Sequence, residues 1–330
     1  MPHITVMGWN IENYGASKWK KSNGGDELVA VIAEVIKKNN IDVAGFCEIR
    51  SKLGDDIGKA LVQILGTANW THQPSDAFGK KRWEQYLFVW NKTKVTSYQA
   101  FLSDFTNPNP PPAKLGFPRQ SQLDRPPYVG YFQTVAAPPK KVAVAIMHSP
   151  SPSSKKGPRD AARNLAEAAA LRTGDGCVLL GDFNVKAPVD VNQAGPGKEA
   201  FQNLVTAGFA QMLDADVLSS LISKKQAWVG MYTDDCKSAP YDQLFCWKAT
   251  AAGITFQNDG VEDLLSEIVA ATANVNTPST QGSYLEPFLA AIDAKNSVAA
   301  VTNYNTVEDA FIAYRVFVSD HLPVVVEVHH

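Results

Sequence analysis

Short apolar runs with almost no polar alternation recur along the chain of 330 residues. Four of them are ITVMGWNI at 4–11, IDVAGFCEI at 41–49, KVAVAIMH at 141–148 and GCVLLGDFN at 176–184. Because successive strand residues point to opposite faces, a strand that is apolar on both faces has to be covered on both. These runs therefore predict buried strands.

Further strand and helix patterns lie between these runs. Strands are also predicted at 85–91, 94–102, 128–135, 241–247 and 321–328, the first two as a pair joined around 91–93. Helices are predicted at 26–38, 55–65, 159–172 and 197–208, with more helical pattern between 260 and 315. The strands outnumber what one doubly wound sheet needs, and several pair by hairpins. We therefore predict an α/β fold in which two mixed sheets pack face to face with helices outside.

The chain shows neither an internal repeat nor a composition shift that would mark a linker. We expect a single domain over 1–330, with insertions near 103–124, which is rich in proline, and near 250–315. No run of about 18 apolar residues is present, so no membrane span is predicted. Since no secretory leader pattern precedes 4–11, the chain as given is expected to be cytoplasmic, or secreted with its signal peptide removed.

The four cysteines predict neither a zinc site nor a redox motif, because none forms a Cys-x-x-Cys pair. Cys47 and Cys177 lie in apolar runs and are expected to be small core residues. The sequence leaves open whether Cys236 and Cys246 pair. The formal net charge is −2, so bulk electrostatics gives no sign of a nucleic-acid binder. A local cleft or a bound cation can still reverse the field for an enzyme that cuts a polyanion.

Most informative are the polar residues at the ends of the apolar runs. They are Asn10, Glu48, His148, Asp182, Asn184, Asp242, Asp320 and His321. Each alone has an ordinary explanation as a turn former or a satisfied loop residue, but their joint occurrence at strand ends makes that explanation improbable. A buried cluster of carboxylates is costly unless a cation neutralises it. Hard oxygen ligands favour Mg²⁺ or Mn²⁺, and two histidines could act as acid and base. Together these groups are the ones that metal-assisted phosphoryl transfer needs.

In this order the motifs resemble the endonuclease/exonuclease/phosphatase superfamily, and within it the deoxyribonuclease I branch. The segments that carry the resemblance are WNIENYG, FCEIR, WEQYLFVW, RPPYVGYF, MHSPSP, GDFNV, YDQLF and SDHLPV. They span nearly the whole chain. The resemblance implies a four-layered α/β/β/α sandwich with the site at one rim.

The same resemblance implies roles for individual residues. Asn10 and Glu48 would hold the metal, helped by Asp320. Asp182 and Asn184 would contact the scissile phosphate or a second metal.

The two histidines would each be backed by a carboxylate, His321 by Asp242 and His148 by Glu84. One would act on the attacking water and the other on the phosphate or the leaving group, in an order that the sequence leaves open.

Basic and aromatic residues are implied to contact the nucleic acid. Arg50 and Arg125 match positions that do so in the branch. Arg82, with Trp83 beside it, stands where the animal secreted nucleases have a tyrosine that contacts the groove. The cysteine that partners Cys236 in those enzymes is absent, so that disulfide is not expected.

These observations favour a divalent-metal-dependent endonuclease that acts on DNA as a monomer. The metal would be Mg²⁺, with Mn²⁺ as an alternative and Ca²⁺ as an alternative structural ion. The alternative function is a phosphatase or phosphodiesterase acting on an inositol or lipid phosphate. Val185 after Asp-x-Asn, and YDQLF in place of Cys-Asp-Arg, disfavour the inositol phosphatases. Abasic-site repair nucleases are a nearer alternative, and a non-catalytic binding domain is a third class.

Overall fold

The structure is a computed structural model, and parts of the chain lie outside the residues that it describes. It describes residues 2–16, 18, 26–50, 52–77, 84–102, 125–150, 158, 161–162, 165, 169–185, 200–214, 217–223, 226, 231–265, 311, 314–315 and 318–330. The predicted insertion at 103–124, most of the stretch 250–315, Arg82 and Trp83 therefore lie outside the described residues.

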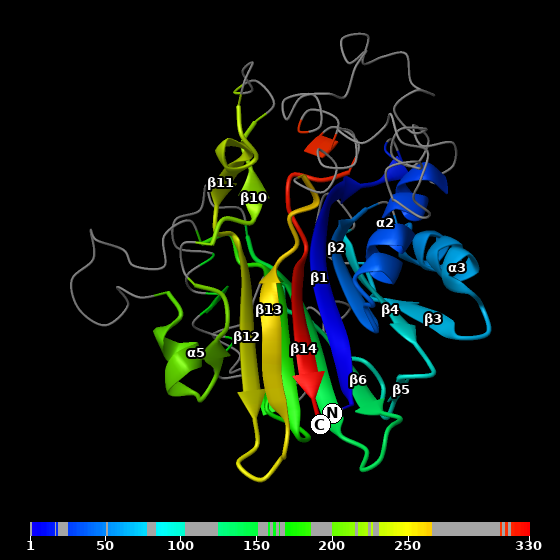
Figure 1. Cartoon of the computed structure of the whole chain (residues 1–330), viewed down its shortest axis with the longest axis vertical. Coiled ribbons are helices and arrows are strands. Elements are labelled where there is room, and N and C mark those ends of the chain that lie inside the picture. Colours follow the sequence, from blue (N-terminus) through cyan, green and yellow to red (C-terminus); the bar gives the residue numbers. More distant parts are fainter. Residues whose placement is uncertain are drawn as a thin grey trace.

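Six strands form the first sheet, in the order β13, β14, β1, β2, β4, β3 (Figure 1). Their bounds are β1 His3–Tyr14, β2 Val43–Ile49, β3 Trp70–Pro74, β4 Gln85–Asn91, β13 Thr255–Val261 and β14 Val324–His329. Strands β1 and β2 are parallel, and the other neighbours in this order are antiparallel. The sheet is therefore mixed, as predicted.

The second sheet also has six strands, in the order β5, β6, β7, β8, β12, β9. Their bounds are β5 Val95–Ser97, β6 Tyr128–Thr134, β7 Lys141–His148, β8 Gly176–Asp182, β9 Ala210–Gln211 and β12 Asp242–Lys248. Here β7 and β8 are the parallel pair. A small ribbon pairs β10 (Ser220–Leu221) with β11 (Lys237–Ala239).

Alternate strand residues enter different apolar layers, as the period of two requires. Val6 lies in the layer between the sheets, with Ile146 and Leu180 of the other sheet. Its neighbour Met7 faces outward, into the layer shared with Ile32 of α2. Burial on both faces explains why these strands read as continuous apolar runs.

Helices cover the outer face of each sheet. The first sheet is covered by α2 (Asp26–Lys38) and α3 (Gly54–Leu65), which lie beside β2 and β3 in Figure 1. The second sheet packs against α5 (Gln202–Thr206) and against Leu165, a helical residue of the predicted helix 159–172. The short 3₁₀ turns η3 (Ala169–Leu171) and η5 (Asp234–Cys236) also lie among the described residues. The order of layers is α/β/β/α.

The predicted pairing of 85–91 with 94–102 is wrong. Strand β4 pairs with β2 and β3 in the first sheet, whereas β5 pairs with β6 in the second. The turn after β4 carries the chain from one sheet to the other. An apolar run indicates that a strand is buried but not which strand lies beside it, so two adjacent runs were mistaken for a hairpin.

Two strands of the first sheet lie where no strand was predicted, and both are at its edges. These are β3, whose residues are mostly half-buried, and β13, which lies in the predicted insertion 250–315 and has no buried residue. An edge strand is covered on fewer sides, so it lacks the continuous apolar run that identifies its neighbours.

All four cysteines are buried and free, so Cys236 and Cys246 do not pair. Burial raises the pKa of the Cys47 and Cys177 thiols, as expected for small core residues. Among the described residues, no helix has both the length and the apolar character to cross a membrane.

Close packing of the two sheets depends on glycine at two positions of the first sheet. A Cβ on Gly8 would overlap the Leu180 side chain, and one on Gly45 would lie 2.9 Å from a Phe88 ring carbon. Ile146 lies 3.3 Å from both added atoms, so the neighbours leave little room to move. Glycine therefore sets how closely β1 and β2 approach the second sheet.

We expect Gly8→Ala to lower the free energy of unfolding by about 1–3 kcal/mol, the usual cost of overpacking a core. The control is Gly260→Ala in β13, where an added Cβ meets nothing within 4 Å. Urea unfolding of both variants measures the difference. Equal midpoints would contradict this account of the interface between the sheets.

Candidate active site

Strand ends from both sheets bring the predicted polar residues to one place. In the second sheet, His148 at the end of β7, Asp182 at the end of β8 and Asp242 at the start of β12 are register partners across three adjacent strands. In the first sheet, Asn10 of β1 and Glu48 of β2 lie beside them. Asn10 Nδ2 donates to Asp182 Oδ2 at 3.0 Å and lies 3.4 Å from Glu48 Oε1.

Asp182 is the centre of the site and is 2% exposed. His148 Nε2 lies 3.8 Å from its Oδ2, and His321 Nε2 lies 3.7 Å from the same oxygen. The backbone N–H of Asn184 donates to Asp182 Oδ1 at 2.8 Å. Burial, with the negative charges of Asp242 and Glu48, raises the pKa of Asp182 to about 6 despite both histidines. The carboxylate therefore sits where a cation would be stabilised.

His148 is held from both sides. Its Nδ1 forms a short hydrogen bond with Glu84 Oε1, the predicted partner, and its backbone N–H donates to the Tyr86 hydroxyl at 3.0 Å. Burial alone would lower the pKa of His148, but the charges of Glu84, Glu48 and Asp182 outweigh burial and raise it. The ring is fixed in orientation and biased toward its protonated form.

His321 has a matching arrangement. Its Nδ1 lies 2.6 Å from Asp242 Oδ2, the predicted partner, and the same oxygen accepts a hydrogen bond from the Ser219 hydroxyl at 2.8 Å. The backbone carbonyl of His321 accepts from Trp9 Nε1 at 3.0 Å. Burial would lower the pKa of His321, but Asp242 and Asp182 raise it well above the ordinary value.

Glu48 sits in a strained backbone conformation, with φ of 62°. Its Oε2 accepts from the backbone N–H of Asn13 at 3.0 Å and pairs with Arg50 Nη2 at 3.2 Å. Burial would raise the pKa of Glu48, but His148 and Arg50 lower it to about 2. The side chain is therefore an ionised carboxylate.

Asp320 lies at the rim, with 27% of its side chain exposed. Its Oδ1 is 3.8 Å from His321 Nε2, and its Oδ2 accepts from Arg315 Nη2 at 3.1 Å. Arg315 also pairs with Glu12 at 2.7 Å. Burial lowers the pKa of the neighbouring Lys18 to about 8, against the pull of Glu12 and Asp320. Asp320 is thus near the site but tied to a peripheral ion-pair group.

The two predicted arginines that the structure describes flank the site. Arg50 Nε and Nη1 are buried and have no hydrogen-bond partner among the described residues. Arg125 Nη1 lies 3.0 Å from the His148 ring nitrogens, and its Nη2 is 3.7 Å from Glu84. Arg125 is the more open of the two, with 28% of its side chain exposed. Both cations border the point where the carboxylates and imidazoles meet.

Several residues that support the site were not singled out in the sequence. The Ser319 hydroxyl donates to the Asn10 carbonyl at 2.5 Å and accepts from the His321 backbone N–H at 3.0 Å, so it ties β1 to the loop before β14. Ser319 opens the triplet SDH and could have been found there. Ser219 and Tyr86 lie far in the sequence from the residues they contact, and no local pattern identifies them.

Three of the clustered residues offer ligand atoms to a metal within 4.8 Å of one another: Glu48, His148 and Asp182. Two are carboxylates, and both are held in a buried site. Oxygen ligands of this kind match a hard divalent cation. Asn10 is adjacent to both carboxylates, whereas Asp320 stands further out, on Arg315. The donor set fits a divalent metal ion.

The sequence profile of the Endonuclease/Exonuclease/phosphatase family matches residues 7–200, which include Asn10, Glu48, His148 and Asp182. The chain belongs to this family. Its members hydrolyse phosphoester bonds and depend on a divalent metal. The predicted family and the predicted sandwich are both confirmed.

Solved structures of the same fold have little sequence identity to the chain. An endonuclease/exonuclease/phosphatase family protein from Bacteroides thetaiotaomicron has 16% identity and a TM-score of 0.54, over 100% of this chain and 98% of that one. A mannosyl-6-phosphatase from the same species has 15% identity and a TM-score of 0.52, over 99% and 100%. D. rerio TDP2, humanized by 14 mutations, has 10% identity and a TM-score of 0.52, over 99% of each chain. A comparison with curated proteins finds no match.

Proposed function

We propose that this family member is an endonuclease that hydrolyses DNA phosphodiester bonds with Mg²⁺. The observation that carries the proposal is the pair of imidazoles on either side of one carboxylate oxygen. His148 Nε2 and His321 Nε2 lie 3.8 and 3.7 Å from Asp182 Oδ2. The Nδ1 atom of each ring is hydrogen-bonded to a different carboxylate, that of Glu84 or of Asp242. Hydrolysis of a diester needs one group for the attacking water and another for the phosphate or the leaving oxygen.

The residues of the chain divide this work. The carboxylates of Glu84 and Asp242 fix the ring orientation of the two histidines, so that each Nε2 faces the reacting centre. One imidazole, in its neutral form, takes the proton of the attacking water, and the other, in its protonated form, donates to the phosphate or to the departing oxygen. The Asn184 side-chain amide, held by the Ser149 carbonyl at 3.2 Å, provides a further polar contact at the same edge.

Glu48 and Asp182, with Asn10 beside them and Asp320 at the rim, would hold the metal. A divalent ion held there would supply positive charge to polarise the phosphate and to stabilise the charge that develops on its oxygens. Glu48 is suited to this because it is ionised and because Asn13 and Arg50 fix its Oε2.

DNA as the substrate is supported by the two arginines beside the carboxylate cluster. Arg125 is partly exposed next to His148, and Arg50 has two buried N–H groups without partners among the described residues. Both lie within the motifs that resemble the deoxyribonuclease I branch. Positive charges at these positions would attract the phosphates of DNA to the site, although the net charge of the chain is slightly negative.

The alternative is a phosphatase that acts on an inositol, lipid or sugar phosphate, since one protein of the same fold is a mannosyl-6-phosphatase. The experiment compares nicking of supercoiled plasmid with release of inorganic phosphate from inositol phosphates and mannose 6-phosphate, each with Mg²⁺. We expect nicking without phosphate release, and no nicking in EDTA. Phosphate release with intact plasmid would replace the nuclease proposal by the phosphatase.

Arg125→Ala is expected to weaken DNA binding on all sequences alike and to reduce the slope of log affinity against log salt by about one. The measurement is DNA binding and cleavage across a salt series, with a small chromogenic phosphodiester as the second substrate. The matched variant is Arg50→Ala, which also removes the partner of Glu48 and so should impair both substrates. Equal losses of activity on DNA and on the small phosphodiester for Arg125→Ala would mean that this guanidinium positions His148 and does not contact DNA.

A further inference from the structure

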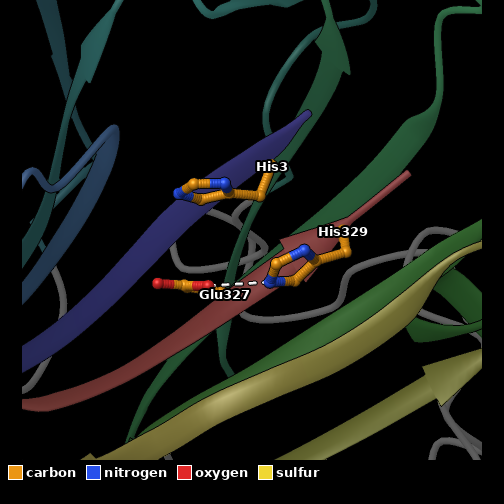
Figure 2. A group of neighbouring side chains, drawn as sticks. All are labelled: His3, Glu327 and His329. Carbon is orange, nitrogen blue, oxygen red and sulfur yellow. Dashed lines mark hydrogen bonds and ion pairs between the residues drawn. The ribbon is translucent and has the colours of Figure 1, made fainter. Parts of the chain in front are cut away.

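A second group of metal-ligating side chains lies at the other end of the first sheet. It consists of His3 at the start of β1 and of Glu327 and His329 at the end of β14 (Figure 2). Asn10 is seven residues further along β1 than His3, a distance of roughly 23 Å at about 3.3 Å per residue. The group is therefore separate from the candidate active site.

Strand pairing brings these three side chains to one face. His3 and His329 are direct partners across the antiparallel β1–β14 pair, and Glu327 is two residues before His329. Ile4 and Val328, the neighbours in sequence, point into the layer between the sheets. The two imidazoles and the carboxylate therefore point outward together.

The ligand atoms are close enough for one ion. One nitrogen or oxygen from each residue lies within 4.8 Å of the others. His329 Nε2 is 2.7 Å from Glu327 Oε2, and the two imidazole rings stack with centroids 5.1 Å apart. A tetrahedral ion with bonds of about 2.0–2.2 Å needs ligand atoms roughly 3.4 Å apart. His3 is exposed, so side-chain rotation can close the remaining gap.

The carboxylate of this group is already oriented by a neighbour. Asn258 of the edge strand β13 donates to Glu327 Oε2 at 2.8 Å. Burial would raise the pKa of Glu327, but the hydrogen bonds from His329 and Asn258 together outweigh it and lower the pKa, so the side chain is ionised. A ligand held by a hydrogen bond from outside the metal shell is the usual arrangement in protein metal sites.

We propose that His3, Glu327 and His329 form a second metal site, which takes Zn²⁺ in preference to Mg²⁺. Two imidazoles and one carboxylate match the ligands of Zn²⁺, whereas Mg²⁺ prefers oxygen ligands alone. Three protein ligands leave a fourth position for water. Because β1 and β14 are the first and last strands, and the chain ends lie side by side in Figure 1, the ion would fasten the two ends of the chain together.

The test is a Zn²⁺ titration by isothermal calorimetry on chain that carries no polyhistidine tag, with Mg²⁺ in excess. Wild type is compared with His329→Gln, with Glu327→Gln, which keeps the shape of the side chain, and with His72→Gln, a histidine paired with Asp55 outside the group. Glu48→Gln is included to separate any Zn²⁺ bound at the candidate active site.

We expect His329→Gln and Glu327→Gln to lose one equivalent of Zn²⁺, or to bind it at least about tenfold more weakly. Even the loss of a residue that only hydrogen-bonds to a metal ligand lowers metal affinity by about tenfold or more. His72→Gln and Glu48→Gln should keep it. Zn²⁺ should raise the melting temperature of wild type but not of His329→Gln, and Mg²⁺-dependent hydrolysis should be unchanged in His329→Gln and in Glu327→Gln. Identical Zn²⁺ stoichiometry and affinity in wild type, His329→Gln and Glu327→Gln would overturn the site, whatever the substrate of the enzyme proves to be.

Discussion

Replacing His321 by alanine is expected to lower kcat by about 10²–10⁴-fold, the usual contribution of a general acid or base. His321 Nε2 lies 3.7 Å from Asp182, and its Nδ1 is bonded to Asp242, so the substitution removes one of the two imidazoles that face the centre. His148→Ala is expected to act similarly. Because the two rings serve one reaction, the double variant should lose less than the product of the single losses.

The measurement is the steady-state hydrolysis of the best substrate found in the plasmid and phosphate-release assays. His72→Ala is the matched control, since this histidine pairs with Asp55 outside the site. A supporting variant, Asp242→Asn, keeps the shape but removes the charge that orients His321, and should give an intermediate loss. Near-normal rates in both His148→Ala and His321→Ala would rule out the paired-imidazole mechanism.

Glu48→Gln is expected to lower metal-dependent activity by at least about 100-fold, because residues that only support metal ligands already cost about 10–100-fold. The substitution keeps the size of the side chain and removes the charge that would hold the divalent ion. Glu48 is an ionised carboxylate, because His148 and Arg50 lower its pKa to about 2 despite burial.

A Mg²⁺ titration of activity distinguishes a lost ligand from a misfolded chain. The concentration of Mg²⁺ at half-maximal rate should rise in Glu48→Gln, while the melting temperature in EDTA stays close to that of wild type. Glu34→Gln, which changes a half-buried carboxylate paired with Lys37 on α2, should alter neither quantity. A normal Mg²⁺ dependence in Glu48→Gln would remove Glu48 from the metal site.

The pairs His321–Asp242 and His148–Glu84 show how much of the site a family resemblance can supply. Both hydrogen bonds are present, although their partners are 79 and 64 residues apart in the sequence. The motifs carried this information because each residue ends or begins a recognisable strand. Their chemical roles stay predictions until the variants are measured.

Local sequence determined the strands that are buried on both faces and the polar residues at their ends. The strands that begin near Val43 and Val142 are apolar throughout, because a strand that is buried on both faces has few positions for polar side chains. For the same reason, a carboxylate directly after such a run, as at Asp182, stands out in the sequence.

Only the tertiary structure decided which strands are neighbours. It placed β4 and β5 in different sheets, and it added β13, whose exposed edge has no apolar run. It also brought Ser319 to Asn10, and His3 to Glu327 and His329. These contacts join residues about 300 or more positions apart, and they depend on sheet order and register. Order and register are set by packing between strands that lie far apart in the sequence, which no local pattern records.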